Sequence, residues 1–523
     1  MFIRWFLQKN RYKLDTRFSK QPMKIRILII ICLSALLSAC QTFDRIVTPI
    51  AAVKELDLVN KSWNSQVESL QFANDNWLNN LNDERLEKYI SIALKNNFSL
   101  QSSQAQLAAQ LEYAHIAAAS LYPTLGFTVN RSRSQTEQAI SPDGTSQDTS
   151  VVTNTSYSGN FNASWEVDVW NRLSAEKKSS SKSAQATAAD YQAARLSLVA
   201  SVARAWFNLN SIKLQIDIAE KSLATIKESL EIVEEQYLNG TQSALNVYLS
   251  RSDYITQQAS ILELRSTLDT AIRDFKVLLG EYPDISLAFD AKLPEIVNEV
   301  PAGIPAELVM RRPDVLADFF TWQATAFDTD AAERALYPSF TLTGSFGTSS
   351  DSLSTLDEKS LLLNLVGGLT QPIFQAGKLK AQAQAARYLE FASFKSYTAT
   401  LLSSFNEVET ALAEEKTLNS RLALLTEVAL LAESGYNLGL DQYTSGVSSY
   451  DTVLDARSRW FNAQTQVVNL KNAILQNRIA LNLALGGDFN EPKQTILNRL
   501  SEENIPELVE EIANQVNQSE DSN

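Results

Sequence analysis

The sequence is an internal duplication, and this feature limits the folds open to it more than any other. Three short motifs occur twice, about 206 to 215 residues apart: Leu121-Tyr122-Pro123 returns as Leu336-Tyr337-Pro338, Tyr237-Leu238-Asn239-Gly240 as Tyr443-Thr444-Ser445-Gly446, and Leu279-Gly280 as Leu485-Gly486. Between the second and third motifs, each copy has 39 residues without Gly or Pro. Repeated units of this kind bury their apolar faces against neighbours. We therefore expect two copies of one unit, two strands followed by two long helices, that cannot close alone.

Very long helices are predicted in both copies. The run from Asn171 to Asn239 contains no Gly or Pro, which at 1.5 Å per residue gives a helix of roughly 100 Å. The run from Lys378 to Ser434 is almost as long. Apolar side chains recur at helical spacing, and small residues are frequent, so we expect closely packed helices.

Four segments alternate between apolar and small polar residues, the pattern of strands. The apolar series are Leu125, Phe127, Val129; Tyr157, Phe161, Trp165, Val167; and Phe340, Leu342, Phe346, followed by a Leu-rich run from Leu361 to Phe374. Each segment has about 10 residues, the length of a tilted membrane strand. The polar stretches Ser132–Thr155, with the turn Pro142-Asp143-Gly144, and Gly347–Ser360 are expected to be long loops at the hairpin tips.

Four strands cannot enclose a lumen, and an open sheet edge cannot face lipid because its amides would lack partners. Closure must therefore come from other copies of the chain, and three copies would supply twelve strands. A small sheet packed on helices is the alternative.

The N-terminus has the features of an export signal. Met23–Cys40 begins with Lys24 and Arg26, continues with an apolar stretch, and ends in Leu37-Ser38-Ala39-Cys40. The apolar stretch is too short to span a bilayer and suits a signal peptide. The ending resembles a bacterial lipobox, which predicts a lipid on Cys40. Because Gln41 follows it, we expect outer-membrane anchoring. Met23 is a candidate start of the chain.

Composition argues against several kinds of function. The chain has one His, His115, and two Cys, so the usual ligands of a metal site and the usual catalytic pairs are missing. The net charge is −14, which disfavours nucleic-acid binding. We expect no enzyme activity, no metal and no cofactor other than the covalent lipid on Cys40. His115 lies in a helical run and is expected to pack or to be solvated.

The mature sequence resembles the TolC-like outer membrane factor family, most closely its lipidated branch associated with RND pumps (OprM and NodT types). The resemblance covers nearly the whole mature chain. It is carried by the lipobox and, in order along the chain, by Ile304–Val315, Leu336-Tyr337-Pro338, Gln371-Pro372-Ile373-Phe374 with Gly377, and Tyr443–Gly446 leading to Val453-Leu454-Asp455-Ala456.

The resemblance implies a mainly α protein with a transmembrane β part, a trimer whose 12-stranded β-barrel continues into a 12-helix periplasmic barrel. The expected segments are a signal peptide at 1–39, an anchor and N-terminal equatorial segment at 40–85, a first repeat at 86–280 with hairpin 124–169 and helices 171–279, a linker at 281–307, a second repeat at 308–486 with hairpin 339–374 and helices 377–485, and a C-terminal equatorial segment with an acidic tail at 487–523.

The resemblance also implies a gate where the helical tips of three copies converge. The matching residues are Tyr443, Gly446 and Asp455, with Asp451 beside a second acidic position of the family; Thr452 and Ser448 depart from the family's pattern. Carboxylates gathered on a threefold axis would attract cations, although Asp451 and Asp455 also suit the first turns of a helix, where acids are favoured by the dipole. Arg251 and Arg457 are possible partners of these acids.

We therefore expect an outer membrane efflux channel, the exit duct of a tripartite export system, anchored by lipid and extending into the periplasm. Expected partners are two further copies, a periplasmic adaptor and an inner-membrane pump. The lipobox and Arg311-Arg312-Pro313-Asp314 favour an RND pump over an ABC pump. The alternative is a periplasmic coiled-coil scaffold lipoprotein without a pore.

Overall fold

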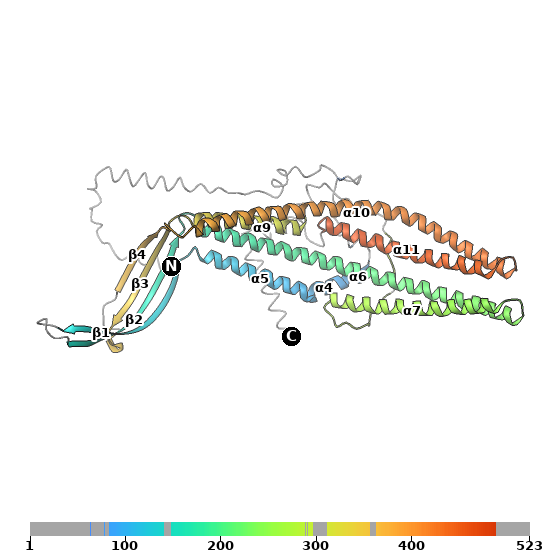
Figure 1. Ribbon diagram of the computed structural model, residues 1–523, viewed down its shortest axis with the longest axis horizontal. Coiled ribbons are helices and arrows are strands. Elements are labelled where there is room, and N and C mark those ends of the chain that lie inside the picture. The colour runs from blue at the N-terminus through green and yellow to red at the C-terminus, as the bar shows by residue number, and fades with distance from the viewer. Residues whose placement is uncertain are drawn as a thin grey trace. The chain divides into compact units, whose positions relative to one another are not determined.

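Both copies of the duplicated unit contain a helix, two strands and two long helices in this order, and the described part of the first copy has one further short helix at its start (Figure 1). The first copy contains α4 (Glu84–Asn96), α5 (Phe98–Ala119), β1 (Thr124–Ile140), β2 (Asp148–Val167), α6 (Arg172–Leu238) and α7 (Ala244–Leu278). The second contains α9 (Pro313–Arg334), β3 (Ser339–Ser350), a 3-10 turn (Leu353–Thr355), β4 (Leu362–Thr370), α10 (Lys378–Thr444) and α11 (Tyr450–Ala484). The protein is thus mainly α-helical with one small β part.

The computed structural model describes residues 83–140, 148–287, 291–295, 311–355 and 362–487, together with Trp63, Leu78 and Phe289. The signal peptide at 1–39, Cys40, most of 40–85, much of the linker at 281–307 and nearly all of 487–523 lie outside these residues, so those expectations stay predictions.

The long helices have matching lengths in the two repeats: α6 and α10 have 67 residues each, and α7 and α11 have 35 each. α10 extends past the Gly- and Pro-free run that ends at Ser434 and continues through Gly435 and Gly439 to Thr444, next to the expected tip at Tyr443–Gly446. A helical glycine costs only about 1 kcal/mol, and tertiary packing outweighs that cost here. Among the described residues, none of the helices combines the length and the apolar character that a membrane-spanning helix needs.

Each short helix that precedes a β-hairpin is hydrogen-bonded at its start to the end of the second long helix of its own repeat. In the first repeat, Asn97 Nδ2 donates to Leu278 O at 3.0 Å, and in the second, Arg312 NH1 donates to Ala484 O at 3.4 Å. Gly280 and Gly486 end the long helices at positive φ, 72° and 75°. A Cβ at these glycines would lie 2.4 Å from Asn96 O and 2.7 Å from Arg311 O, respectively. The repeated Leu-Gly motif therefore reflects a close backbone approach.

The four strands form one antiparallel sheet in the order β1-β2-β3-β4, and the register has no bulge. Because side chains alternate between faces, the register gathers the predicted apolar series on one face. That face carries Leu125, Phe127 and Val129 of β1 opposite Ala163, Phe161 and Gly159 of β2, followed by Phe340, Leu342 and Phe346 of β3 and Leu369, Leu365 and Leu363 of β4. The other face is mainly Ser, Thr, Asn and Gly.

The first hairpin is much longer than the sequence pattern indicated. Most of the stretch Ser132–Thr155 was expected to be loop, but β1 runs to Ile140 and β2 begins at Asp148. The two strands stay paired from Thr124↔Ser164 to Ile140↔Asp148, whereas pairing of β2 with β3 ends at Tyr157↔Ser350. Beyond that point β1 and β2 form a two-stranded ribbon, which alternation of apolar residues cannot reveal because both of its faces are largely polar.

The second β-hairpin, formed by β3 and β4, also departs from the predicted limits. β3 continues into the expected loop as far as Ser350. The Leu-rich run Leu361–Phe374 forms a strand only over Leu362–Thr370. Pro372 has no N–H to donate to a ladder, and the chain leaves the sheet before it.

The helices pack in a single layer with a defined order (Figure 1). Substantial packing among the described helices joins neighbours in the order α5-α6-α9-α10 next to the sheet and α7-α6-α11-α10 toward the far tips. One apolar core among the described residues surrounds Trp206, Phe207 and Phe275, where α4, α6, α7 and α11 meet. α6 is therefore the central helix, and α10 lies at one edge of both rows.

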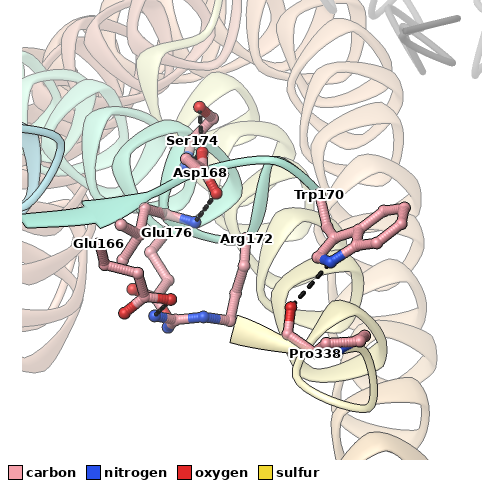
Figure 2. Close-up of polar contacts among 8 residues, drawn as sticks. Glu166, Asp168, Trp170, Arg172, Ser174, Glu176 and Pro338 are labelled. Carbon is pink, nitrogen blue, oxygen red and sulfur yellow. Dashed lines mark hydrogen bonds and ion pairs between the residues drawn. The ribbon is translucent and has the colours of Figure 1, made fainter. Parts of the chain in front are cut away.

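The link from the sheet to α6 is held by several polar contacts (Figure 2). The carboxylate of Asp168 accepts hydrogen bonds from the backbone N–H groups of Leu173 and Ser174, at 3.0 and 2.8 Å, and so caps the helix start. Arg172 pairs with Glu166 of β2 at 2.8 Å and with Glu176 of α6 at 2.6 Å. The Trp170 indole donates to Pro338 O of the other repeat at 2.8 Å. The strand-to-helix junction therefore forms polar contacts with residues of both repeats.

Candidate functional site

The candidate site is the pair of helical tips, which have the same backbone turn. Gly240 and Gly446 have φ of 74° and 73°. In the first tip, Gly240 N–H bonds to Tyr237 O and Thr241 N–H to Gln236 O; in the second, Gly446 N–H bonds to Tyr443 O and Val447 N–H to Gln442 O. This is the Schellman ending of a helix, which requires a residue at positive φ. Gly446, predicted as a gate residue, therefore shapes the turn.

Tyr443 holds the two tips of one chain together. Its side chain is 7% exposed. The phenol donates to Gln236 Oε1 at the end of α6 and accepts from Gln242 Nε2 in the first tip at 3.2 Å. Its ring lies 5.4 Å from that of Tyr450, measured between centroids. The predicted gate tyrosine is thus part of a small core within one chain.

This tip core extends along α11 to an ion pair whose arginine is buried. Arg457, 7% exposed, donates from NH2 to Asp253 Oδ2 of α7 at 3.0 Å. Tyr450 shares a hydrogen bond with Ser250 of α7 at 3.0 Å, and burial raises the pKa of its phenol. Two residues of the second helical hairpin (α10 and α11), Tyr450 and Arg457, are therefore hydrogen-bonded to α7 of the first helical hairpin (α6 and α7).

The predicted acids lie outside this core. Asp451 is in the first turn of α11 and Asp455 one turn later, both exposed. Asp455 pairs with Arg459 and not with Arg457. Its Oδ2 lies 2.8 Å from Arg459 Nε, and both side chains are well exposed. Within one chain, the suggested pairing of Arg457 with these acids is therefore not found, because the guanidinium points to Asp253. Arg251 is exposed on α7, and no carboxylate partner for it occurs in the described part of the chain.

Two buried donors of the tip have no acceptor among the described residues: Arg457 NH1 and the indole N–H of Trp460. Trp460 stacks on Tyr436 at 5.2 Å between ring centroids, so the indole is held in place. A buried donor without a partner costs about 1 to 3 kcal/mol. The tip is therefore well packed but incompletely hydrogen-bonded within one chain.

Sequence reasoning found Tyr443, Gly446 and Arg457 but missed their partners Gln236, Gln242 and Asp253. The duplication contained one usable signal: Asp253 occupies the repeat position of Arg459, so the charge at this position is reversed between the copies. His115 is on α5 with its Nδ1 3.7 Å from Glu112 Oε2 and its side chain half exposed, the solvated position that was one of the two expected.

A sheet with one apolar face, joined to helices of this length that end in paired tips, defines the wall of a channel that crosses an outer membrane. The family model named Outer membrane efflux protein matches residues 89–281 and 304–487. The chain belongs to this family.

Relatives along almost the whole chain agree with this assignment. The sequence is 28% identical over 424 residues to the pyoverdine export outer membrane protein OpmQ of Pseudomonas putida KT2440, covering 80% of this chain and 89% of OpmQ. It is 26% identical over 468 residues to the cation efflux system protein CusC of Escherichia coli K12, covering 88% and 99%. The structure of the open state of the MtrE outer membrane channel of Neisseria gonorrhoeae superposes with a TM-score of 0.72 at 25% identity, covering 84% and 97%.

The predicted family, fold class and outer-membrane location are therefore confirmed, and this protein is an outer membrane efflux channel. The alternative of a scaffold lipoprotein without a pore finds no support.

Proposed function

We propose that three copies of this chain form the exit duct of a tripartite export system. In this assembly the sheets would close a 12-stranded barrel in the outer membrane, and the helices would close a 12-helix barrel in the periplasm. The duct would be a passive conduit without catalytic chemistry. The observation that carries the proposal is that one chain leaves both edges of its sheet and of its helix layer open.

The open sheet supports closure by further copies. β1 and β4 are the two edges, each paired on one side only. Side chains of the apolar face are widely exposed, such as Leu125 at 74%, Leu363 at 80% and Leu365 at 71%. A lipid environment explains this exposure, but unpaired strand amides are not tolerated in lipid. Pairing of β4 with β1 of a neighbouring copy would remove both edges.

The helix layer supports the same arrangement. α10, at one edge, exposes Tyr388, Phe391 and Leu424, each at more than 60%. α7, at the other edge near the tips, exposes Tyr248 at 73% and Leu262 at 66%. Apolar surface of this kind marks an interface. Packing of α10 against α5 and α7 of the next copy would cover it.

A gate at the helical tips is part of the proposal. Tyr443, Gly446, Arg457 and its partner Asp253 would keep the two hairpins of each copy together, while exposed Asp451 and Asp455 would face their equivalents in the other copies. Three acids around one axis repel one another and attract cations. Arg251, exposed on α7 of the first tip, is available to pair with an acid of a neighbouring copy.

The remaining partners follow from the sequence and from the relatives. OpmQ and CusC are named for export of pyoverdine and for a cation efflux system, so a periplasmic adaptor and an inner-membrane pump would complete the machine here too. The lipobox and Arg311–Asp314 favour an RND pump. A lipid on Cys40 would anchor the chain; mass spectrometry that finds an unmodified Cys40 would contradict this.

Conductance of the purified full-length protein in planar bilayers tests the proposal. Wild type should pass ions as a trimer, and Asp455→Ala should raise conductance and lower cation selectivity because one acid per copy is lost. Glu427→Ala, the same change of charge on exposed α10 outside the tip, is the control. A monomeric protein that passes no ions would overturn the duct, and unchanged selectivity in Asp455→Ala would remove Asp455 from the gate.

A further inference from the structure

The four described strands contain two basic residues, Arg131 and Arg133, and both are in β1. The acids of the same strands are Glu137 and Asp148 in the two-stranded ribbon and Glu166 at the helix end of β2, where it is paired with Arg172. Arg131 and Arg133 are therefore an isolated positive pair.

The register places this pair at the outer limit of the apolar face. Because β1 has no bulge, Arg131 and Arg133 share a face with Leu125, Phe127 and Val129. On β2 the same face runs from Trp165, near the helices, to Tyr157, which lies opposite Arg131. Aromatic side chains at both limits of an apolar band are typical of the two surfaces of a membrane. The basic pair begins at the limit that is farther from the helices.

The four-stranded sheet ends at the same level. Tyr157↔Ser350 is the last pair between β2 and β3, and Arg133↔Thr155 lies in the two-stranded ribbon beyond it. The helices are periplasmic, so the hairpin tips point outward, and the level of Arg131 is that of the outer-leaflet headgroups.

Both guanidinium groups are available to a ligand. Both side chains are exposed, and neither forms an ion pair with a carboxylate among the described residues. The guanidinium carbon of Arg131 lies 5.6 Å from the centroid of the Tyr157 ring. A cation over an aromatic face is held in a defined direction, which leaves the edge of the guanidinium free to donate hydrogen bonds.

We propose that Arg131 and Arg133 bind the phosphate groups of an anionic lipid in the outer leaflet. Guanidinium donates two parallel hydrogen bonds to phosphate oxygens, and partial exclusion of water by lipid chains strengthens these bonds. The apolar residues below the pair would contact the acyl chains of the same lipid. The inference rests on the barrel proposed above, because it needs this face of the sheet to lie in the membrane.

Native mass spectrometry of the full-length trimer in neutral detergent provides the test, with a bis-phosphorylated lipid A as probe and phosphatidylcholine as the neutral reference. Wild type should prefer lipid A. The double variant R131Q/R133Q should bind it roughly thirtyfold more weakly, on the scale known for two basic residues at a charged lipid surface. The double variant K416Q/R421Q removes the same charge from exposed α10 and should bind as wild type. R131K/R133K keeps the charge but not the paired donors and should lie between.

Conductance measured on the same samples separates this inference from the proposed function. A wild type that conducts normally but shows no preference for lipid A, or a Gln variant that binds like wild type, would overturn the lipid site and leave the duct intact. Displacement of lipid A by inorganic phosphate at equal phosphate concentration would reduce the site to a simple anion site and also overturn the inference. A wild type that does not conduct would count against the duct itself.

Discussion

The two helical tips of this chain share a backbone but differ in their surroundings. Tyr237 and Tyr443 occupy the same repeat position, three residues before the glycine of the same turn, yet Tyr237 is 47% exposed and Tyr443 is 7% exposed. Leu249 and Asp253 of the first tip correspond to Asp455 and Arg459 of the second.

The difference arises from where the hairpins lie. α11 of the second hairpin packs against α6, the first long helix of the other repeat, so the second tip rests on the first. In contrast, α7 is an edge helix in one chain. Duplication therefore preserved the helix lengths and the turns. The side chains at the tips diverged, so that some form a buried core and others, including charged residues, are exposed. We expect the buried side chains to control the stability of the tips, and the exposed charged side chains to control the conductance and ion selectivity of the channel.

The largest effect should come from truncating the buried tyrosine. Tyr443→Ala removes an aromatic side chain and its bonds to Gln236 and Gln242, so the local opening free energy at the tip should fall by about 3 kcal/mol. Tyr237→Ala should change it by less than about 0.5 kcal/mol. Hydrogen exchange of the tip amides in the trimer measures both values. Equal losses in the two variants would mean that Tyr237 is covered by another copy.

The two ion pairs of the tips should also differ in how much they stabilise the protein, and the pair with the buried arginine should contribute more. Asp253→Ala leaves the buried Arg457 without its carboxylate, and because Asp253 itself is 43% exposed we expect a loss of about 2 kcal/mol, below the value for a fully buried pair. Asp455→Ala breaks an exposed pair and should cost under about 1 kcal/mol while altering conductance. The same hydrogen-exchange measurement applies. If Asp455→Ala proved the more destabilising, the acid would belong to a buried contact between copies.

Replacement of two glycines, one within α10 and one in the turn that follows it, should change stability with opposite signs. Gly446→Ala places a Cβ at φ 73° and should destabilise the turn by about 1 to 2 kcal/mol, although nothing surrounds it. Gly435→Ala, within the helix and also in open space, should stabilise it by up to about 1 kcal/mol. Thermal unfolding of the trimer reports both. Destabilisation by Gly435→Ala would indicate that a neighbouring copy approaches the helix there.

The smallest effect concerns a buried tyrosine away from the tip. Tyr397 of α10 is fully buried and its phenol has no partner among the described residues, so Tyr397→Phe should be neutral or stabilising by about 1 kcal/mol. Tyr450→Phe loses the bond to Ser250 and should cost a similar amount.

Alkaline pH provides a second test of Tyr397→Phe. Burial raises the pKa of Tyr397 from 10.0 to about 12. The unfolded chain therefore ionises first, and the stabilisation is complete below pH 10 and lost as pH rises toward 12. Tyr397→Phe should remove this part of the alkaline loss of thermal stability. An unchanged pH profile would contradict it.

Much of the fold was predictable because its determinants are local. Breaks in the Gly- and Pro-free runs mark the turns at Gly240, Gly280, Gly446 and Gly486, and each of these glycines has positive φ. Alternation of apolar residues predicted which strand residues share a face. The limits of β1 and β2 were missed because a polar ribbon has no apolar residues that alternate with polar ones. The end of α10 was marked by the motif at Gly446, although Gly435 and Gly439, whose weak helix propensity is overridden by packing, interrupt the run before it.

The sequence by itself determined the duplication, the long helices, the two-faced strands and the inability of one copy to bury its own surface, since periodicity and turn residues act over a few neighbours along the chain. Only the tertiary structure decided that Tyr443 is buried while Tyr237 is not, and that Arg457 bonds to Asp253 instead of the nearby acids. Burial and ion pairing depend on which helix lies alongside, and two copies of one motif placed beside different neighbours acquire different chemistry.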